Sequence, residues 1–148
     1  MNDNFTPTGE LRIIVRDAGT GEIKLDQVYK NLVVTVGKNF IASRMVGTSS
    51  AVMSHMAVGT SSTVAAAENT TLGAELARVA LSVAGGTPTS NTVLYTATYP
   101  AGVGTGALQE AGIFNAGSGG TMLSRTTYAA INKGASDEMI INWTITVG

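Results

Sequence analysis

The chain has 148 residues, no cysteine and a formal net charge of −1 at pH 7. This length is typical of one domain with a core of its own, and the missing cysteine excludes disulfide bonds and thiolate metal sites. The near-zero charge predicts no general attraction to nucleic acid or to an anionic membrane. The start, "MNDNFTPTGE", is acidic and polar, unlike a signal peptide, and no apolar run is long enough to span a bilayer.

The charge is unevenly distributed. The segment from Met45 to Asn132 has only five charged side chains, which are Glu68, Glu75, Arg78, Glu110 and Arg125. An average domain has about 25% charged residues. The surface of this segment must therefore consist mainly of Thr, Ser, Gly, Asn and Ala. Such a surface loses little on desolvation, so we expect it to pack against other proteins. The alternative is a neutral surface that simply stays soluble.

The first 36 residues predict an arm followed by a hairpin. Residues 1–9 are expected to be extended, because Pro7 and Gly9 interrupt regular structure, and Phe5 is a candidate assembly contact within them. Residues 10–148 are expected to form a single domain. It begins with a hairpin over about 10–36, since apolar residues alternate from Leu11 to Val15 and "DAGTGE" supplies the turn.

One short helix is predicted over residues 37–47. Phe40, Ile41, Arg44 and Met45 recur at helical spacing and form a mainly apolar face, and Gly47 could end the helix. The stretch is too short to be stable by itself, so its stability must come from docking.

The rest of the chain predicts strands separated by Gly, Asn and Ser turns. Residues 60–74 are expected to be a loop, and Ala77, Val79, Leu81 and Val83 are expected on one strand face. The clearest strand places Trp143, Ile141 and Ile145 in the core. Expected strands are 53–59, 75–84, 91–99, 107–116, 121–131 and 138–147. Together with the hairpin, this pattern predicts an all-β fold with one short helix, arranged as an antiparallel β-sandwich or jelly roll.

A glycine-rich stretch, "AGVGTGALQEAGIFNAGSGGTML" over 101–123, raises the question of phosphate binding. Gly102, Gly104 and Gly106 are spaced GxGxG rather than GxGxxG, and the glycines that follow exclude the helix that a dinucleotide site needs. We therefore interpret the stretch as a strand connection, a strand and a hairpin turn.

Few residues are candidates for catalysis. His55 is the only histidine and has no acidic neighbour in sequence, so a catalytic triad or a histidine metal cluster is not expected. Arg78 should pair with Glu75 or Glu110, because an unpaired charge in such an apolar region would be costly. We interpret Glu75, Arg78 and Glu110 as a structural ion-pair set. No enzyme activity, cofactor, metal or nucleic-acid partner is expected.

The order of motifs resembles small virion proteins of tailed bacteriophages. "HMAVG" at 55–59, Glu75 to Arg78, and Glu110 to Phe114 before a glycine hairpin are similar to the N-terminal attachment domain of phage tail-collar fibre proteins. The similarity covers about residues 30–148. Fibre proteins continue into a shaft and tip, whereas this chain ends at Gly148, which favours a stand-alone module.

The resemblance implies a non-enzymatic structural protein of the virion, made in the host cytoplasm. The first hypothesis is a capsid decoration (cement) protein that binds the major capsid protein and stabilises the shell, as a homo-oligomer in the particle. The second is a tail or baseplate adaptor or short tail-fibre attachment protein. A soluble enzyme or carbohydrate-binding domain is the third.

Overall fold

The computed structural model describes residues 6–47 and 50–148, which form nine β-strands and one α-helix. All the strand pairs are antiparallel, and the sheet order is β4-β3-β7-β8-β2-β1-β9-β6-β5. The elements are β1 (Thr8–Asp17), β2 (Ile23–Val33), α1 (Thr35–Met45), β3 (His55–Gly59), β4 (Glu75–Ala80), β5 (Thr87–Thr89), β6 (Thr92–Tyr99), β7 (Gly106–Phe114), β8 (Met122–Lys133) and β9 (Asp137–Thr146).

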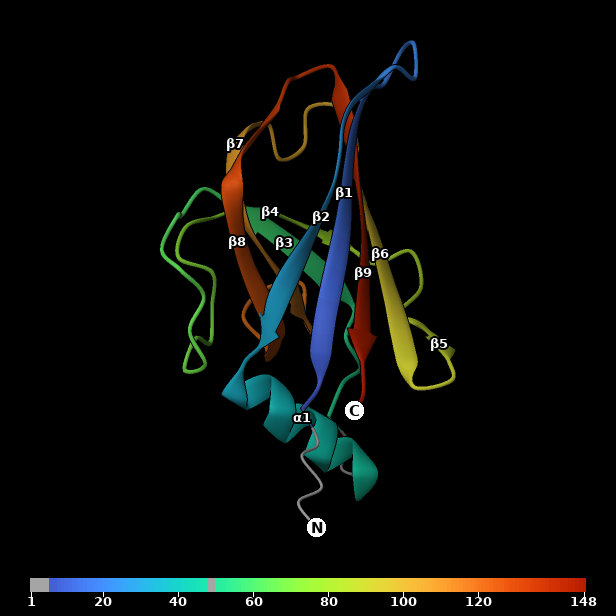
Figure 1. Cartoon of the computed structure of the whole chain (residues 1–148), viewed down its shortest axis with the longest axis vertical. Helices are drawn as coiled ribbons and strands as arrows, with labels where there is room; N and C mark the ends of the chain where they lie inside the picture. The colour runs from blue at the N-terminus through green and yellow to red at the C-terminus, as the bar shows by residue number, and fades with distance from the viewer. Residues whose placement is uncertain (1–5, 48–49) are drawn as a thin grey trace.

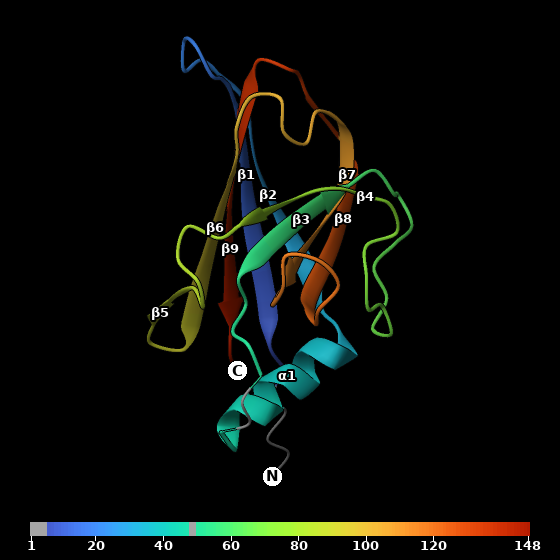
Figure 2. The same cartoon turned by 180° about the vertical axis from the view of Figure 1, so that it is seen from behind.

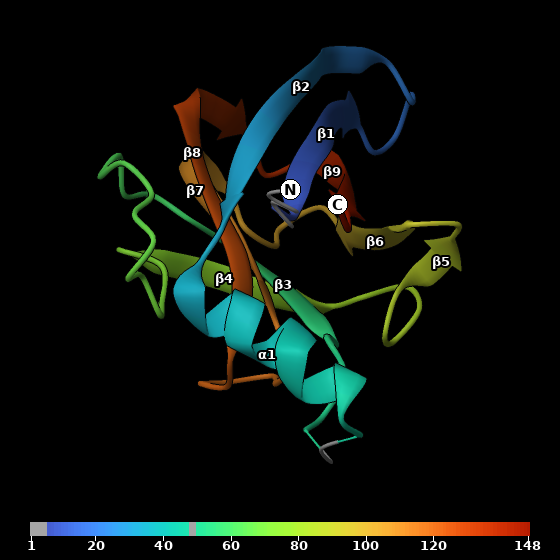
Figure 3. The same cartoon turned by 60° about the horizontal axis from the view of Figure 1, so that its bottom comes forward.

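The sheet is curled into two halves that face each other. The front half contains β2, β1, β9, β6 and β5 (Figure 1), and the back half contains β4, β3, β7 and β8 (Figure 2). They join where β2 pairs with β8 over only two residue pairs, Leu32 with Arg125 and Val33 with Ser124. Seen from below, the front half curves over the back half (Figure 3). The chain is therefore mostly β with one short helix, as the alternating pattern predicted.

The main core lies between the two halves. Leu11 and Ile13 enter it from β1, Met56 from β3 and Ile113 from β7, and all four are fully buried. The alternation of β9 places Met139, Ile141, Trp143 and Ile145 on this inner side, with Trp143 fully buried. On the neighbouring strand β6, Tyr95 is opposite Trp143 and Tyr99 is opposite Met139. The inward-facing residues of these strands therefore pack into one core.

The helix departs from the predicted amphipathic pattern. It begins at Thr35, two residues before the predicted start, and Gly37 is its one buried residue. A Cβ on Gly37 would overlap the carbonyl of Leu123, so the glycine lets the helix backbone lie against β8. Phe40 and Ile41 are partly buried against the core, but Met45 is 82% exposed, so the expected apolar face does not extend to Met45.

Two other predicted boundaries were wrong. β1 begins at Thr8, so residues 8 and 9 of the expected arm belong to the sheet, where they pair with Thr146 and Ile145 of β9. β4 ends at Ala80, so Val83, expected on the same strand face as Ala77, Val79 and Leu81, lies beyond the strand and is 54% exposed. Beyond the end of β4, Ser82 N–H donates to Thr96 O of β6 (2.8 Å).

Candidate functional site

The outer side of the back half, called here the covered face, brings together most of the charged residues of the charge-poor segment. Strand register determines their positions. Ala57 on β3 pairs with Arg78 on one side and with Gly112 on the other, and Gly112 pairs with Arg125. Gly59 similarly lies between Glu75 and Glu110. Two arginines and two glutamates therefore share one face around β3.

Glu110 and Arg125 form a fully buried ion pair on this face. Arg125 Nη2 and Nε donate to Glu110 Oε2 at 2.9 and 3.2 Å, and the two side chains are 2% and 0% exposed. Glu110 also accepts three backbone N–H groups, from Ser61 and Ala74 at Oε1 and from Gly73 at Oε2. Five donors thus compensate the carboxylate for the loss of water.

These donors belong largely to residues 60–74, called here the covering loop. Arg125 holds the same loop by donating to Thr63 O and to Asn69 Oδ1, both at 2.9 Å. Leu72 of the loop is buried in a second apolar cluster, with Val34, Ala57, Phe114 and Met122. The loop has no regular secondary structure, so its conformation depends on the buried pair beneath it.

Small residues make room for the covering loop. A Cβ on Gly59 would overlap both Ala74 O and the Glu110 carboxylate. A Cβ on Gly112 would lie 3.0 Å from Leu72 Cδ2. The glycines at these two strand positions are therefore explained by close approach of the loop rather than by backbone conformation.

Arg78 lies beside Glu75, with Nη2–Oε2 at 2.7 Å and Nε–Oε1 at 2.9 Å. Its guanidinium also stacks 3.8 Å from the centre of the Phe114 ring and donates to the carbonyls of Ala116 and Gly119. It therefore connects β4 to the β7–β8 turn. Glu110 is not its partner: the expected set of three residues is divided between two separate ion pairs.

Arg125 is the site residue that sequence reasoning did not single out. The available signal was compositional, because Arg125 is the other cation in a segment with only five charged residues. Its pairing with Glu110 depends on the β7–β8 register, which contains an irregularity between Leu108 and Glu110. That irregularity could not be read from the residue pattern.

The other sequence features considered for a site are His55, the glycine-rich stretch and Phe5. His55 begins β3, and its Nδ1 lies 2.8 Å from Ser54 Oγ. The glycine-rich stretch forms a turn, strand β7 and the hairpin turn before β8, with no helix in it. Phe5 lies outside the described residues. Among the residues that are described, no group of three His, Cys, Asp or Glu side chains could hold a metal ion.

Buried titratable groups elsewhere make internal hydrogen bonds. Burial raises the pKa of Tyr99 and Tyr128, whose hydroxyls donate to Met56 O (2.7 Å) and Glu110 O (3.1 Å). Burial also lowers the pKa of Lys133, whose ammonium donates to Pro100 O and Asp137 O. Both phenols remain protonated donors at neutral pH, so the arrangement stabilises strands rather than preparing a nucleophile.

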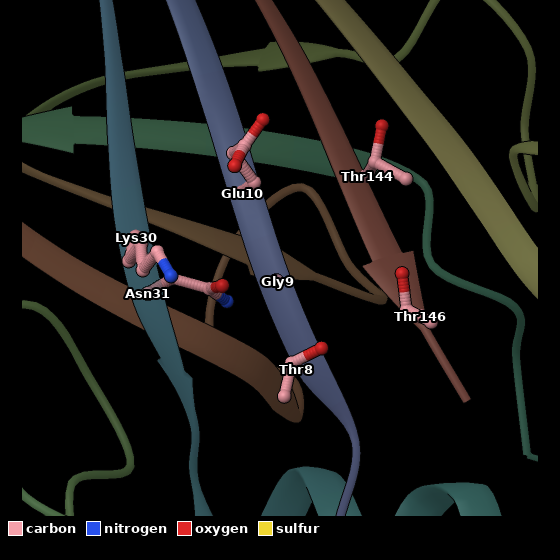
Figure 4. A pocket seen from close by; sticks show the side chains of 7 residues that line it. All are labelled: Thr8, Gly9, Glu10, Lys30, Asn31, Thr144 and Thr146. Atoms are coloured by element: carbon pink, nitrogen blue, oxygen red, sulfur yellow. The ribbon is translucent and has the colours of Figure 1, made fainter. Parts of the chain in front are cut away.

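A hollow of about 430 Å³ lies on the front half, at the lower ends of β2, β1 and β9 (Figure 4). Glu10 and Lys30, which are opposite each other in the β1–β2 register, line it together with threonine hydroxyls. A Cβ on Gly9 would overlap the Asn31 amide, whose Oδ1 and Nδ2 are buried without a hydrogen-bond partner in the described structure. The hollow is polar and carries one charge of each sign.

No protein-family model matches the chain, and neither the curated proteins nor the solved structures include a match to it. In the described part of the chain, no helix is long and apolar enough to cross a membrane.

Proposed function

We propose that the protein is a non-enzymatic structural protein of a tailed-phage virion, and specifically a capsid decoration protein that stabilises the shell. In this proposal the curled sheet is a β-sandwich of the jelly-roll kind, a compact body suited to sitting on a shell surface. The partners are other virion proteins, with the major capsid protein first among them.

The observation that carries the proposal is the internal neutralisation of charge. Glu110 and Arg125 are buried against each other, and Arg78, only 8% exposed, is paired with Glu75. Glu68 is the one charged residue among the described positions 50–132 outside these two pairs. This part of the surface is therefore almost free of charge. Such a surface costs little to dehydrate when it packs against another protein.

A tail or baseplate adaptor is the second candidate. The order of elements favours it: α1 is followed by β3 with "HMAVG", by β4 with Glu75 and Arg78, and by β7 and its glycine hairpin. This is the order in which the motifs resemble the attachment domain of tail-collar fibres. Either role would add interface area that stabilises an assembled particle.

Copy number in purified virions distinguishes these candidates. On a quantitatively stained gel, hundreds of copies per particle indicate a head protein, and a few dozen or fewer indicate a tail component. Absence from the particle would overturn both. Addition of purified protein to particles stripped of it should restore resistance of the head to heat or osmotic shock if the shell is the partner. Unchanged resistance at full occupancy would contradict the decoration role.

The assembly role expected for Phe5 stays a prediction within this proposal. Phe5→Ala should weaken retention on stripped particles while leaving the melting temperature of the free protein unchanged. Phe40→Ala is the matched control: Phe40 packs against the core, so this variant should lower the melting temperature. Equal retention of Phe5→Ala and the unaltered protein would contradict an assembly role for Phe5.

A further inference from the structure

We propose that the solvent side of β2, β1, β9 and β6 is a docking surface for a second copy of this chain. This open face is made by the even-numbered residues of β1 (8–16), β2 (26–32), β9 (138–146) and β6 (92–98), whose odd-numbered neighbours on β1, β9 and β6 point largely into the core. No described segment of the chain lies over it, and Figure 1 looks directly onto it.

Aliphatic side chains lie among the polar residues of the open face. Ile14 and Ile140 are side by side in the β1–β9 register. Val28 on β2, opposite Arg12, is 52% exposed, and Leu94 on β6, opposite Thr144, is 39% exposed. Around them are threonines and Asn142, which already accepts a hydrogen bond from Thr96 Oγ1 (2.9 Å). Hydroxyls and amides can bond across an interface at a small desolvation cost.

The charges of the open face favour a copy of itself as the occupant. The face carries three acids, Glu10, Asp26 and Glu138, and three bases, Arg12, Arg16 and Lys30. Arg12 pairs with Asp26 and Arg16 with Glu138 within the chain. The patch is therefore neutral and carries both signs. A two-fold contact places a patch against itself, which is repulsive for a patch of one sign and favourable for a balanced one.

Glu10 and Lys30 remain for contacts between copies. They are opposite each other in register, yet no ion pair joins them, and they line the polar hollow described above. A partner side chain that enters this hollow would find a carboxylate, an ammonium and threonine hydroxyls. A second copy supplies the same groups, so each hollow can receive the partner's hydroxyls or opposite charge.

The size of the open face fits a modest dimer. Four strands about 4.8 Å apart, with nine residues on β1 and β9 and seven on β2 and β6 at about 3.4 Å each, give a footprint of roughly 520 Å² in projection. Side chains that stand out from the sheet make the accessible area larger than this projection. A stable interface buries about 800 Å² on each partner. We therefore expect a reversible dimer rather than an obligate one.

The test is sedimentation equilibrium of the purified chain from about 1 to about 500 µM, a range that detects dissociation constants of a modest interface. Val28→Lys and Leu94→Lys place an unpaired charge on the open face. Matched controls are Val64→Lys, on the covering loop, and Leu76→Lys, on β4; these side chains are 77% and 47% exposed. The unaltered chain should dimerise. Both open-face variants should raise the dissociation constant by about tenfold or more, and both controls should leave it unchanged.

Several results would overturn the proposal. One is a monomer over the whole concentration range. Another is an equal rise in the dimer dissociation constant for Val64→Lys and Val28→Lys when melting curves show that both variants are folded. A third is a monomer whose Val28→Lys variant no longer binds stripped particles, which would assign the open face to a different virion protein. Because the measurement uses the purified chain, absence from virions would overturn the proposed function without affecting this result.

Discussion

The two outer faces of the sheet show opposite ways of treating polar surface. On the covered face, the Glu110–Arg125 pair is buried, and a loop of fifteen residues, 60–74, lies over it and is held by hydrogen bonds to it. On the open face, ion pairs such as Arg12–Asp26 stay in contact with water, with side chains 54% and 35% exposed. Both faces are built from antiparallel strands. They differ in what they contact: residues 60–74 on the covered face and water on the open face.

The comparison indicates where stability and association should reside. A buried ion pair is costly to break, because the partner that remains keeps its charge without solvent. An exposed pair is screened and contributes little. Substitutions on the covered face should therefore change folding, and substitutions on the open face should change association while leaving folding nearly unaltered.

The largest effect is expected from Glu110→Ala. It leaves Arg125 buried without its carboxylate and removes the acceptor of three loop N–H groups. Loss of one partner of a buried pair costs about 3–5 kcal/mol of unfolding free energy, which urea denaturation of the variant and the unaltered protein would measure. The double variant Glu110→Leu with Arg125→Met should cost less than Glu110→Ala alone. A single-variant cost below 1 kcal/mol, roughly that of an exposed pair, would show that the pair does not hold the covering loop.

A smaller loss is expected from Gly59→Ala, which tests the fit of the covering loop rather than its charges. The new methyl group would overlap Ala74 O and the Glu110 carboxylate. Overpacking of this kind costs about 1–3 kcal/mol, and hydrogen exchange of the loop amides should accelerate. Thr144→Ala on the open face is the control and should change stability by less than about 0.5 kcal/mol. Unchanged stability and exchange in Gly59→Ala would mean that the loop is not closely packed there.

Asp137 on the front half should make a pH-dependent contribution to the stability of the fold. The Lys24 ammonium, 2.6 Å away, and the Gly134 N–H hold the pKa of Asp137 below its usual value, and Asp137 in turn raises the pKa of Lys24. Asp137 therefore stabilises the fold above its unfolded pKa of about 3.9, and this contribution is lost as pH falls through the lower folded value.

Asp137→Asn tests this assignment through melting temperatures between acid and alkaline pH. The difference between the two proteins should be constant near neutrality. It should shrink below about pH 4, and again above about pH 10 as Lys24 loses its proton. A difference that is the same at acid and neutral pH would contradict an ionised Asp137 as the source.

The smallest effect on folding is expected from Arg12→Ala on the open face. The Arg12–Asp26 pair is exposed, so its loss should change the unfolding free energy by at most about 1 kcal/mol. Its contribution should also decline with added salt, unlike that of the buried pair. A loss as large as that of Glu110→Ala would mean that the two faces do not differ in the way described.

Much of the fold follows from local pattern. The alternation in β1, β6 and β9 predicted which side chains point inward, and Trp143 lies among them, fully buried. The patterns at the helix and at β4 were less informative. Met45 continues an apolar stripe but is 82% exposed, and Val83 continues an alternation beyond the end of its strand. Periodicity describes a face but does not specify whether another element will cover it.

The sequence by itself determined an all-β chain with one short helix, a charge-poor central segment and inward-facing residues on most strands. These properties depend on side-chain period and composition, which are local. Only the tertiary structure decided that Glu110 pairs with Arg125, that residues 60–74 cover one outer face, and that the opposite face stays open. Those outcomes depend on strand order and register, which bring together residues far apart in the chain. A one-residue shift in pairing would turn Glu110 and Arg125 to the other side of the sheet.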